Sequence, residues 1–365
     1  MKRNSLAATL ALLLAVGVAG CSSPAPTAPS PAPMGAPQQA MSLEGAGASF
    51  PAPLYTKWYD EYNKITGVKV NYQAIGSGGG IKAITEGTVD FGASDGIMTD
   101  EQIAAAAAAH GPILHIPMTS GAVAVIHNLE GIGSGQLKLT GDVLADIYLK
   151  QINKWNDSRI TALNPGLNLP DTDIAVVHRS DGSGTTFIFT NYLSRVSADW
   201  QSKVGNATSV DWPGDIGGEK NAGVAGQVKQ IPGAIGYVEL AYAVQNKIAW
   251  AQLRNAAGNY LEPSLQATTR AAEGVTLPDD MKVMITNSTN PDAYPIAGFT
   301  WMLAYVNQTD PAKGLALVNM LWWGIHDGQQ YASPLDYAPL SANAIARAEN
   351  EILSIMYNGQ PLLER

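Results

Sequence analysis

Residues 174–195 read IAVVHRSDGSGTTFIFTNYLSR and contain the change of structure on which our fold prediction rests. The β-branched run IAVVH (174–178) predicts a buried strand, and the segment from Thr185 towards Arg195 predicts a helix. Between them lies RSDGSGTT (179–186), a turn that contains glycine and small hydroxyl residues. A strand that passes through such a loop into a helix is typical of α/β proteins.

Segments of the same kind recur along the chain. Residues 68–75 predict a strand that ends at the loop GSGGG, with a helix beginning near Ile81. Thr99 and Gln102 have the spacing of a capping box ahead of an alanine-rich run, which predicts a helix start. The other predicted elements are strands at 89–93 and 298–307, and helices at 142–155, from Pro311 to Trp323 behind the N-cap Asp310, and at 342–356. We therefore predict an α/β fold without internal repeats.

Three of these segments place small, uncharged polar residues at a predicted helix start. They are GAGASFPAPLY at 45–55, GSGGG at 76–80 and RSDGSGTT at 179–186. Free backbone amides and the helix dipole favour anions at a helix start, and glycine allows close approach. Taken singly, each segment is also consistent with an ordinary turn, and Ser49, Ser77 or Ser183 with a simple N-cap. Together, and with one arginine among them, they favour an anion site.

Length and charge restrict the classes of protein to which the chain can belong. Removal of a leader (1–20) and a tether up to residue 41 leaves a body at 42–365, which is more than one hydrophobic core usually supports and suggests two domains. Without Lys2 and Arg3, 20 basic residues face 31 acidic ones, a net charge of −11 that argues against nucleic-acid binding. The single cysteine excludes an intramolecular disulfide and a cysteine-built zinc site.

The N-terminal segment 1–41 predicts export and attachment to a membrane. Two basic residues precede the apolar run 6–18, which is too short to span a bilayer and fits a signal peptide, 1–20. The run ends in VAGC, which resembles a bacterial lipobox and would make Cys21 the lipidated residue. The alternative is an ordinary signal peptide with an incidental cysteine. Residues 21–41 are rich in proline and alanine and predict an extended tether.

Motifs of known enzyme classes are missing from the sequence. The Walker pattern and the G-x-S-x-G elbow do not occur, and no pair of histidines has the H-E-x-x-H spacing. The five histidines are His110, His115, His127, His178 and His326. No nucleophile stands beside a general base, and His178, next to Arg179, is better explained as a hydrogen-bonded loop residue. We therefore predict a protein that is not an enzyme and has no cofactor and no metal site.

Beyond these patterns, the sequence resembles the phosphate-binding protein of bacterial phosphate ABC transporters, a family of solute-binding proteins. The segments that carry the resemblance are 45–55, 70–82, 89–95, 146–157, 163–170, 175–193 and 232–243. The resemblance implies the two-lobed, hinged, type II periplasmic-binding-protein fold with the ligand in a cleft between the lobes. It places lobe 1 at 42–114 plus 297–365 and lobe 2 at 115–296.

The resemblance also assigns site residues. The phosphate ligands that it implies are Ser49, Phe50, Ser77, Asp95, Arg179, Ser183, Gly184 and Thr185. Asp181 occupies the position of an aspartate that pairs with the arginine. Two departures occur: Ser49 stands where many relatives have threonine, and Gly78 stands where many have serine, so we expect a looser glycine loop. Asp95 could otherwise be a helix cap, and Arg179 with Asp181 an ordinary surface ion pair.

These residues suggest how phosphate would be selected. Phosphate carries a proton near neutral pH and sulfate does not, so Asp95 can accept a hydrogen bond from phosphate but only repels sulfate. We expect a monomer that binds inorganic phosphate with high affinity outside the cytoplasm and delivers it to the permease and ATPase subunits of an importer. The other hypotheses are a secreted phosphatase, a receptor for sulfate or molybdate, and a structural lipoprotein.

Overall fold

The computed structural model describes residues 41–214 and 216–364. The predicted signal peptide, Cys21 and the predicted tether up to residue 40 lie outside the described residues. No helix of the described part is long and apolar enough to cross a membrane.

The centre of the structure is a mixed sheet of nine strands. In spatial order its strands are β2 (Lys69–Ala74), β1 (Ser42–Gly47), β3 (Phe91–Ser94), β12 (Ala297–Tyr305), β4 (Ile113–His127), β8 (Ala234–Glu239), β6 (Ala175–Arg179) and β7 (Ile216–Gly218), and β9 (Ala249–Trp250) pairs with the end of β4. Strands β1, β2 and β3 are parallel, as are β6, β7 and β8, and the antiparallel strands β12 and β4 stand between these two sets.

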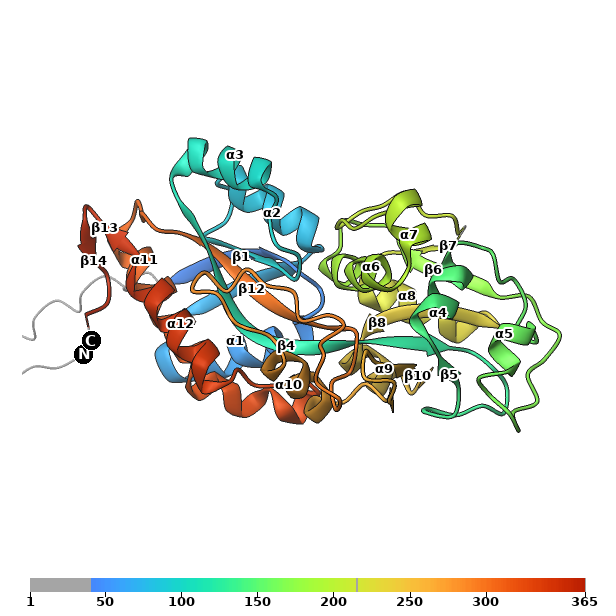
Figure 1. Cartoon of the computed structure of the whole chain (residues 1–365). Coiled ribbons are helices and arrows are strands. Elements are labelled where there is room, and N and C mark those ends of the chain that lie inside the picture. Colours follow the sequence, from blue (N-terminus) through green and yellow to red (C-terminus); the bar gives the residue numbers. More distant parts are fainter. Residues whose placement is uncertain (1–40, 215, 365) are drawn as a thin grey trace, which may run out of the picture. The chain divides into compact units, whose positions relative to one another are not determined.

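The long strand β4 connects the two sets. Its residues up to Ala122 pair with β12, and its residues from Val123 onward pair with β8. Figure 1 shows β4 running from the elements around β1 and β12 to the elements around β6 and β8. The described residues nevertheless belong to one compact unit, so the lobe boundaries remain a prediction.

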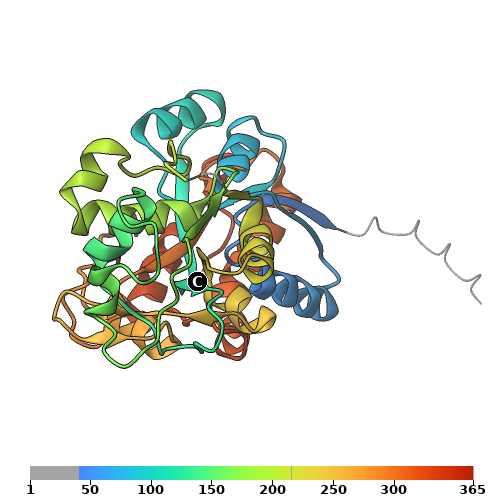
Figure 2. The same ribbon diagram turned by 90° about the vertical axis from the view of Figure 1, so that its right-hand side faces the viewer.

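Helices connect the parallel strands, as parallel pairing requires, and in the view of Figure 2 they lie on opposite sides of the strands. The helices of the described residues are α1 (Ala52–Thr66), α2 (Ser77–Thr85), α3 (Asp100–His110), α4 (Gly141–Tyr148), α5 (Ser158–Thr161), α6 (Gly184–Val196), α7 (Ala198–Lys203), α8 (Lys220–Gln230), α9 (Leu240–Asn246), α10 (Leu265–Glu273), α11 (Pro311–Ile325) and α12 (Ala342–Leu353), with the short 3₁₀ helices η1 (Asp327–Tyr331) and η2 (Ser333–Leu335) after α11. Of these, α1, α2, α6, α7 and α8 make the connections between parallel strands. Small pairings at the edges are β5 (Lys138–Leu139), β10 (Gln252–Arg254) and β11 (Tyr260–Leu261), and β13 (Met356–Tyr357) with β14 (Gln360–Pro361).

Two predicted helix starts are confirmed by their caps. The Thr99 hydroxyl accepts a hydrogen bond from the Gln102 amide, and the Gln102 side chain accepts one from the Thr99 amide, which completes a capping box. The Asp310 carboxylate accepts from the amides of Ala312 and Lys313, with Pro311 as the first helical residue. These short-range contacts depend on neighbouring residues alone, which is why the sequence predicts them.

Three predicted boundaries are wrong. The helix predicted at 142–155 ends at Tyr148, because Lys150 adopts a left-handed conformation with φ of 59°. Trp155 is instead a buried anchor whose indole donates to the Gly233 carbonyl at 2.9 Å. The helix predicted at 342–356 ends at Leu353, since Met356 pairs in β13. Helix α2 begins at Ser77 rather than near Ile81, so the GSGGG segment is its first turn.

The cap of α11 carries the first prediction. Asp310→Ala removes the acceptor for two backbone amides and should lower the free energy of unfolding by about 1 kcal/mol. Asp310→Asn keeps an oxygen at the same position and should lose only a small part of that. Urea unfolding followed by circular dichroism measures both variants. Equal stability of the alanine variant and the wild type would contradict the cap.

A candidate anion site at the ends of the parallel strands

The segments singled out in the sequence all follow the carboxyl ends of parallel strands. Ser49 follows β1, Ser77 follows β2, Asp95 follows β3, and residues 179–185 begin at the end of β6. In open α/β sheets the loops after such strand ends gather at one edge, where ligands bind. The structure brings these residues together through hydrogen bonds between segments as far as 172 residues apart.

Ser49 is held at the start of α1 without capping it. The N-cap residue of α1 is Pro51, and no side chain makes a cap hydrogen bond there, so the alternative of a simple N-cap is wrong for Ser49. Its carbonyl accepts from the Tyr242 hydroxyl at 2.6 Å, and its hydroxyl accepts from the side-chain amide of Asn221 at 3.1 Å. The neighbouring Phe50 is buried, and its carbonyl accepts from a tyrosine hydroxyl of the C-terminal part of the chain.

Ser77 joins two of the other segments. Its hydroxyl oxygen accepts from the amide of Asp95 at 3.1 Å and from the amide of Gly184 at 3.0 Å, and it donates over a long 3.4 Å to Oδ2 of Asp95. The N-cap residue of α2 is Gly76, with no side-chain cap bond, so Ser77 is not a simple N-cap either. A Cβ atom on Gly184 would lie 2.5 Å from the Ser77 hydroxyl oxygen and from an Asp95 carboxylate oxygen, so only glycine fits there.

The glycine loop is tightly packed, contrary to the expectation of a looser segment. The Gly78 amide donates to the Gly182 carbonyl at 3.0 Å, and a Cβ on Gly78 would lie 3.1 Å from the Cα of Gly182. Gly76 has a φ of 88°, and a Cβ there would meet Asp181 at 2.5 Å. The glycines therefore let the start of α2 approach the loop after β6 closely.

Arg179 forms a buried ion pair with Asp181. Its Nε donates to one carboxylate oxygen at 2.7 Å and its Nη2 to the other at 2.5 Å, with only 1% of the arginine side chain exposed. The alternative of a surface ion pair is therefore wrong. Burial raises the pKa of Asp181, but Arg179 and the Lys220 amide outweigh it and hold that pKa below its ordinary value. The carboxylate fixes the guanidinium plane and reduces the net charge that Arg179 presents.

Ser183 and Thr185 occupy the start of α6. Ser183 is the N-cap, since its hydroxyl accepts from the Thr186 amide at 3.0 Å, so the simple cap interpretation is correct for this one serine. The Thr185 hydroxyl accepts from Arg179 Nη1 at 3.4 Å and from the side-chain amide of Asn221 at 3.2 Å. Both residues are fully buried.

Asp95 is a buried carboxyl group with a strongly shifted pKa. Thr99, not Asp95, caps α3, so the alternative of a helix cap is wrong. Burial raises the pKa of Asp95 to about 7, although a hydrogen bond from the Thr300 hydroxyl at 2.8 Å and the charge of Arg179 both act to lower it. Both protonation states of this group are therefore accessible near neutral pH.

Two members of the cluster escaped the sequence analysis. Asn221 lies in the first turn of α8 in the segment GEKNAG, which contains no recognisable motif. Thr300 is the one threonine in the buried strand β12, and a small polar side chain in an apolar run is a signal that could have identified it. Both are completely buried.

The histidines take no part in the cluster. His178 has its two ring nitrogens 2.9 and 3.1 Å from the carbonyl oxygens of Arg179 and Gly214 and can donate its N–H to either, as expected for a satisfied histidine. Among residues 41–214 and 216–364, no group of three or more histidine, cysteine, aspartate or glutamate side chains could hold a metal ion.

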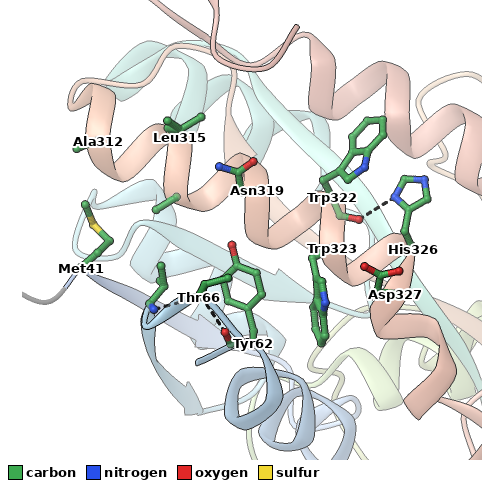
Figure 3. A pocket seen from close by; sticks show the side chains of 12 residues that line it. Met41, Tyr62, Thr66, Ala312, Leu315, Asn319, Trp322, Trp323, His326 and Asp327 are labelled. Atoms are coloured by element: carbon green, nitrogen blue, oxygen red, sulfur yellow. Dashed lines mark hydrogen bonds between the residues drawn. The ribbon is translucent and has the colours of Figure 1, made fainter. Parts of the chain in front are cut away.

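A cavity of about 860 Å³ lies elsewhere, between α11 and the segment joining α1 to β2 (Figure 3). Its lining is largely aromatic and aliphatic, and none of its residues belongs to the anion cluster. It is lined by Met41, Tyr62, Thr66, Val68, Ala312, Leu315, Ala316, Asn319, Trp322, Trp323, His326 and Asp327. A cavity of this size and composition identifies no particular ligand, and the converging donors that suit an anion lie around Arg179 instead.

Comparison with known proteins places the chain in a family. The family model described as a PBP superfamily domain matches residues 31–317. The phosphate-binding protein PstS of Xylella fastidiosa is 46% identical over 313 residues, which cover 85% of each chain. The PstS protein of Pasteurella multocida is also 46% identical, over 85% of this chain and 90% of its own length. This chain belongs to the PstS family of phosphate-binding proteins.

Solved structures of similar proteins confirm the predicted type II fold of this family member. A phosphate-binding protein from Stenotrophomonas maltophilia has a TM-score of 0.68 and 21% identity, covering 85% of this chain and 94% of its own. The periplasmic phosphate-binding protein PfluDING has a TM-score of 0.68 and 20% identity, covering 85% and 93%. Membership of a family of binding proteins also confirms the prediction that the chain is not an enzyme.

The buried carboxyl of Asp95 makes a prediction for the ligand-free protein. Because its folded pKa of about 7 exceeds the ordinary value of 3.8, the folded state favours its protonated form and loses stability as the pH rises through that interval. Asp95→Asn should therefore stabilise the ligand-free protein by ~3 kcal/mol more at pH 8 than at pH 4.5. Urea unfolding at both pH values measures this, with the exposed Asp199→Asn as a control that should show little difference. A gain in the free energy of unfolding that does not change with pH would contradict the raised pKa of Asp95.

Proposed function

We propose that the protein binds inorganic phosphate with high affinity outside the cytoplasm and delivers it to an ABC-type phosphate importer. The observation that carries this proposal is the cluster of Ser49, Ser77, Thr185, Arg179 and Asp95, all buried and joined by hydrogen bonds at the carboxyl ends of parallel strands. Membership of the PstS family supports it.

The charge balance of the cluster suits an oxyanion held mainly by neutral donors. The positive charge of Arg179 is largely offset by Asp181, so hydroxyl groups and backbone amides supply most of the donors. Such donors satisfy phosphate oxygens without adding buried charge, whose desolvation costs several kcal/mol per ion. This explains how a chain with an excess of acidic residues binds an anion. Phe50 would contribute through its backbone amide and Ser183 through its hydroxyl hydrogen, whereas the Gly184 amide donates to Ser77 and would hold that hydroxyl in place beside the ligand.

Asp95 would distinguish phosphate from sulfate. Its Oδ1 accepts from Thr300 at 2.8 Å, whereas among the described residues Oδ2 has only the long contact from Ser77 and is left as the acceptor for a proton carried by the ligand. At pH 8, above the Asp95 pKa of about 7, sulfate has no proton to donate and would face a carboxylate without a hydrogen bond, a mismatch worth roughly 10⁴–10⁵ in selectivity. The role of Asp95 in selectivity is thus part of the proposal.

The setting of the protein follows from its predicted N-terminal segments. Cleavage before Cys21 and lipidation of that residue would anchor a monomer to a membrane of the cell envelope through the tether 21–41. Closure of the predicted lobes, 42–114 plus 297–365 against 115–296, would enclose the ligand and form the surface that the permease recognises.

Calorimetry tests the proposal directly. The purified protein, freed of bound phosphate by unfolding and refolding, is titrated with phosphate and then with sulfate. We expect one tight phosphate site per chain and no detectable sulfate binding. Tight binding of sulfate, or no binding of phosphate, would refute the proposal, and turnover of a chromogenic phosphate monoester would favour the phosphatase hypothesis instead.

A further inference from the structure

Asn221 occupies a position between two of the candidate ligand hydroxyls. It lies in the first turn of α8 with no exposed surface. One amide, Nδ2, donates to the hydroxyl oxygen of Ser49 at 3.1 Å and to that of Thr185 at 3.2 Å. Ser49 precedes α1 and Thr185 lies in the first turn of α6, so this amide connects two segments that are far apart in the chain.

The orientation of this amide is determined by its other end. The Asn221 carbonyl oxygen, Oδ1, accepts from the backbone amide of Glu239 at 2.9 Å. Glu239 is itself fully buried and caps α9. If the Asn221 amide were flipped, its NH₂ group would stand against the Glu239 N–H, and two donors would meet where a hydrogen bond now forms. The NH₂ group therefore faces the two hydroxyls.

This orientation determines where the hydroxyl hydrogens can point. A hydroxyl group has two acceptor lone pairs and one hydrogen to donate. The Thr185 oxygen already accepts from Asn221 and from Arg179 Nη1, so donation is its remaining capacity. The Ser49 oxygen accepts from Asn221, and neither hydroxyl donates to another group within residues 41–214 and 216–364. Both hydroxyl groups can therefore donate a hydrogen bond to an added acceptor.

We propose that Asn221 is a positioning residue that orients the Ser49 and Thr185 hydroxyls as donors to the bound anion. The inference rests on the proposed phosphate-binding function. Asn221 acts through the two hydroxyls, not through the anion, and its contribution comes from having no lone pair on Nδ2 with which to accept their hydrogens. Without Asn221, either hydroxyl can rotate and donate in another direction. Phosphate binding is then weakened by the free energy needed to order that hydroxyl again.

The test is phosphate calorimetry on the full chain with two variants of different volume. Asn221→Ala and Asn221→Leu both remove the amide, while leucine keeps a side chain of similar size. We expect each to weaken phosphate binding about 100-fold, as two donors to a charged ligand lose their orientation. Affinity within threefold of the wild type in either folded variant would overturn the inference.

A second measurement separates positioning from support of the fold. In a Ser49→Ala, Thr185→Val background the hydroxyls are gone, so adding Asn221→Ala should weaken phosphate binding less than about threefold. A residue that only supports the fold would cost the same affinity in both backgrounds, and that result would overturn the inference. If Asn221→Leu does not fold, the alanine comparison in the two backgrounds still decides it.

Asn164 offers a matched control. It is also a buried asparagine with three hydrogen bonds, to the amide and carbonyl of Lys138 and to the carbonyl of Ile160. Asn164→Ala should lower thermal stability and leave phosphate affinity within threefold. If the wild type binds no phosphate, the proposed function and this inference fail together. If the wild type binds and the Asn221 variants bind equally well, only the inference fails.

Discussion

Replacing Arg179 by alanine should weaken phosphate binding about 10³-fold, the largest loss that we expect from any single side chain of the site. The guanidinium group is the only cation in the cluster of the described residues, and 1% of its side chain is exposed. Its removal leaves the buried carboxyl of Asp95 and the carboxylate of Asp181, 17% exposed, without a cation beside them, so an incoming anion meets uncompensated negative charge. Calorimetry with phosphate measures the effect.

Two further arginine variants make this result interpretable. Arg179→Lys keeps the charge but loses the two-pronged pairing with Asp181, so we expect an intermediate loss of affinity. Arg159→Ala is the matched control, because Arg159 also forms ion pairs with aspartate, in its case Asp146 and Asp157, but is 43% exposed. It should bind phosphate like the wild type. Removing one partner of a buried pair costs about 3–5 kcal/mol of stability, so circular dichroism must show that Arg179→Ala is folded. Unchanged affinity in that folded variant would exclude Arg179 from the site.

Asp95→Asn should reduce the preference for phosphate over sulfate by at least about 100-fold. The asparagine amide can donate to an oxyanion that carries no proton, and it removes the buried negative charge that repels sulfate. Phosphate affinity should fall by less than about tenfold, since the Arg179 contacts and the hydroxyl donors remain. Competition calorimetry with both anions at pH 8 gives the ratio.

Asp181→Asn is the control for this selectivity. Its carboxylate faces Arg179 and the Lys220 amide, so the variant should change the affinities for phosphate and sulfate by similar factors. If Asp95→Asn rejects sulfate as strongly as the wild type does, a proton on the ligand is not what the site detects. The pH dependence of stability described above is an independent check, because it concerns the same carboxyl without any ligand.

Much of the fold could be predicted because its signals are short-range. The Thr99 capping box and the Asp310 cap involve residues three or fewer positions apart, and both are present. Strand β6 and helix α6 follow from a β-branched run and a hydroxyl-rich turn. The errors fall where distant contacts compete with local preference, as at Trp155, which bonds to Gly233 and leaves the predicted helix.

The chain alone specified which residue types were available for an oxyanion: neutral hydroxyls and glycines at helix starts, one arginine with a nearby aspartate, and a further aspartate after β3. Their classification as caps or ligands was open, because a serine before a helix has the same local sequence in either role. Tertiary structure decided which of them are caps: Ser183 caps α6, whereas Ser49 and Ser77 cap no helix and Ser77 instead bonds to Gly184. It alone revealed Asn221, since a hydrogen bond between distant segments depends on how strands are ordered in the sheet and leaves no trace in neighbouring residues.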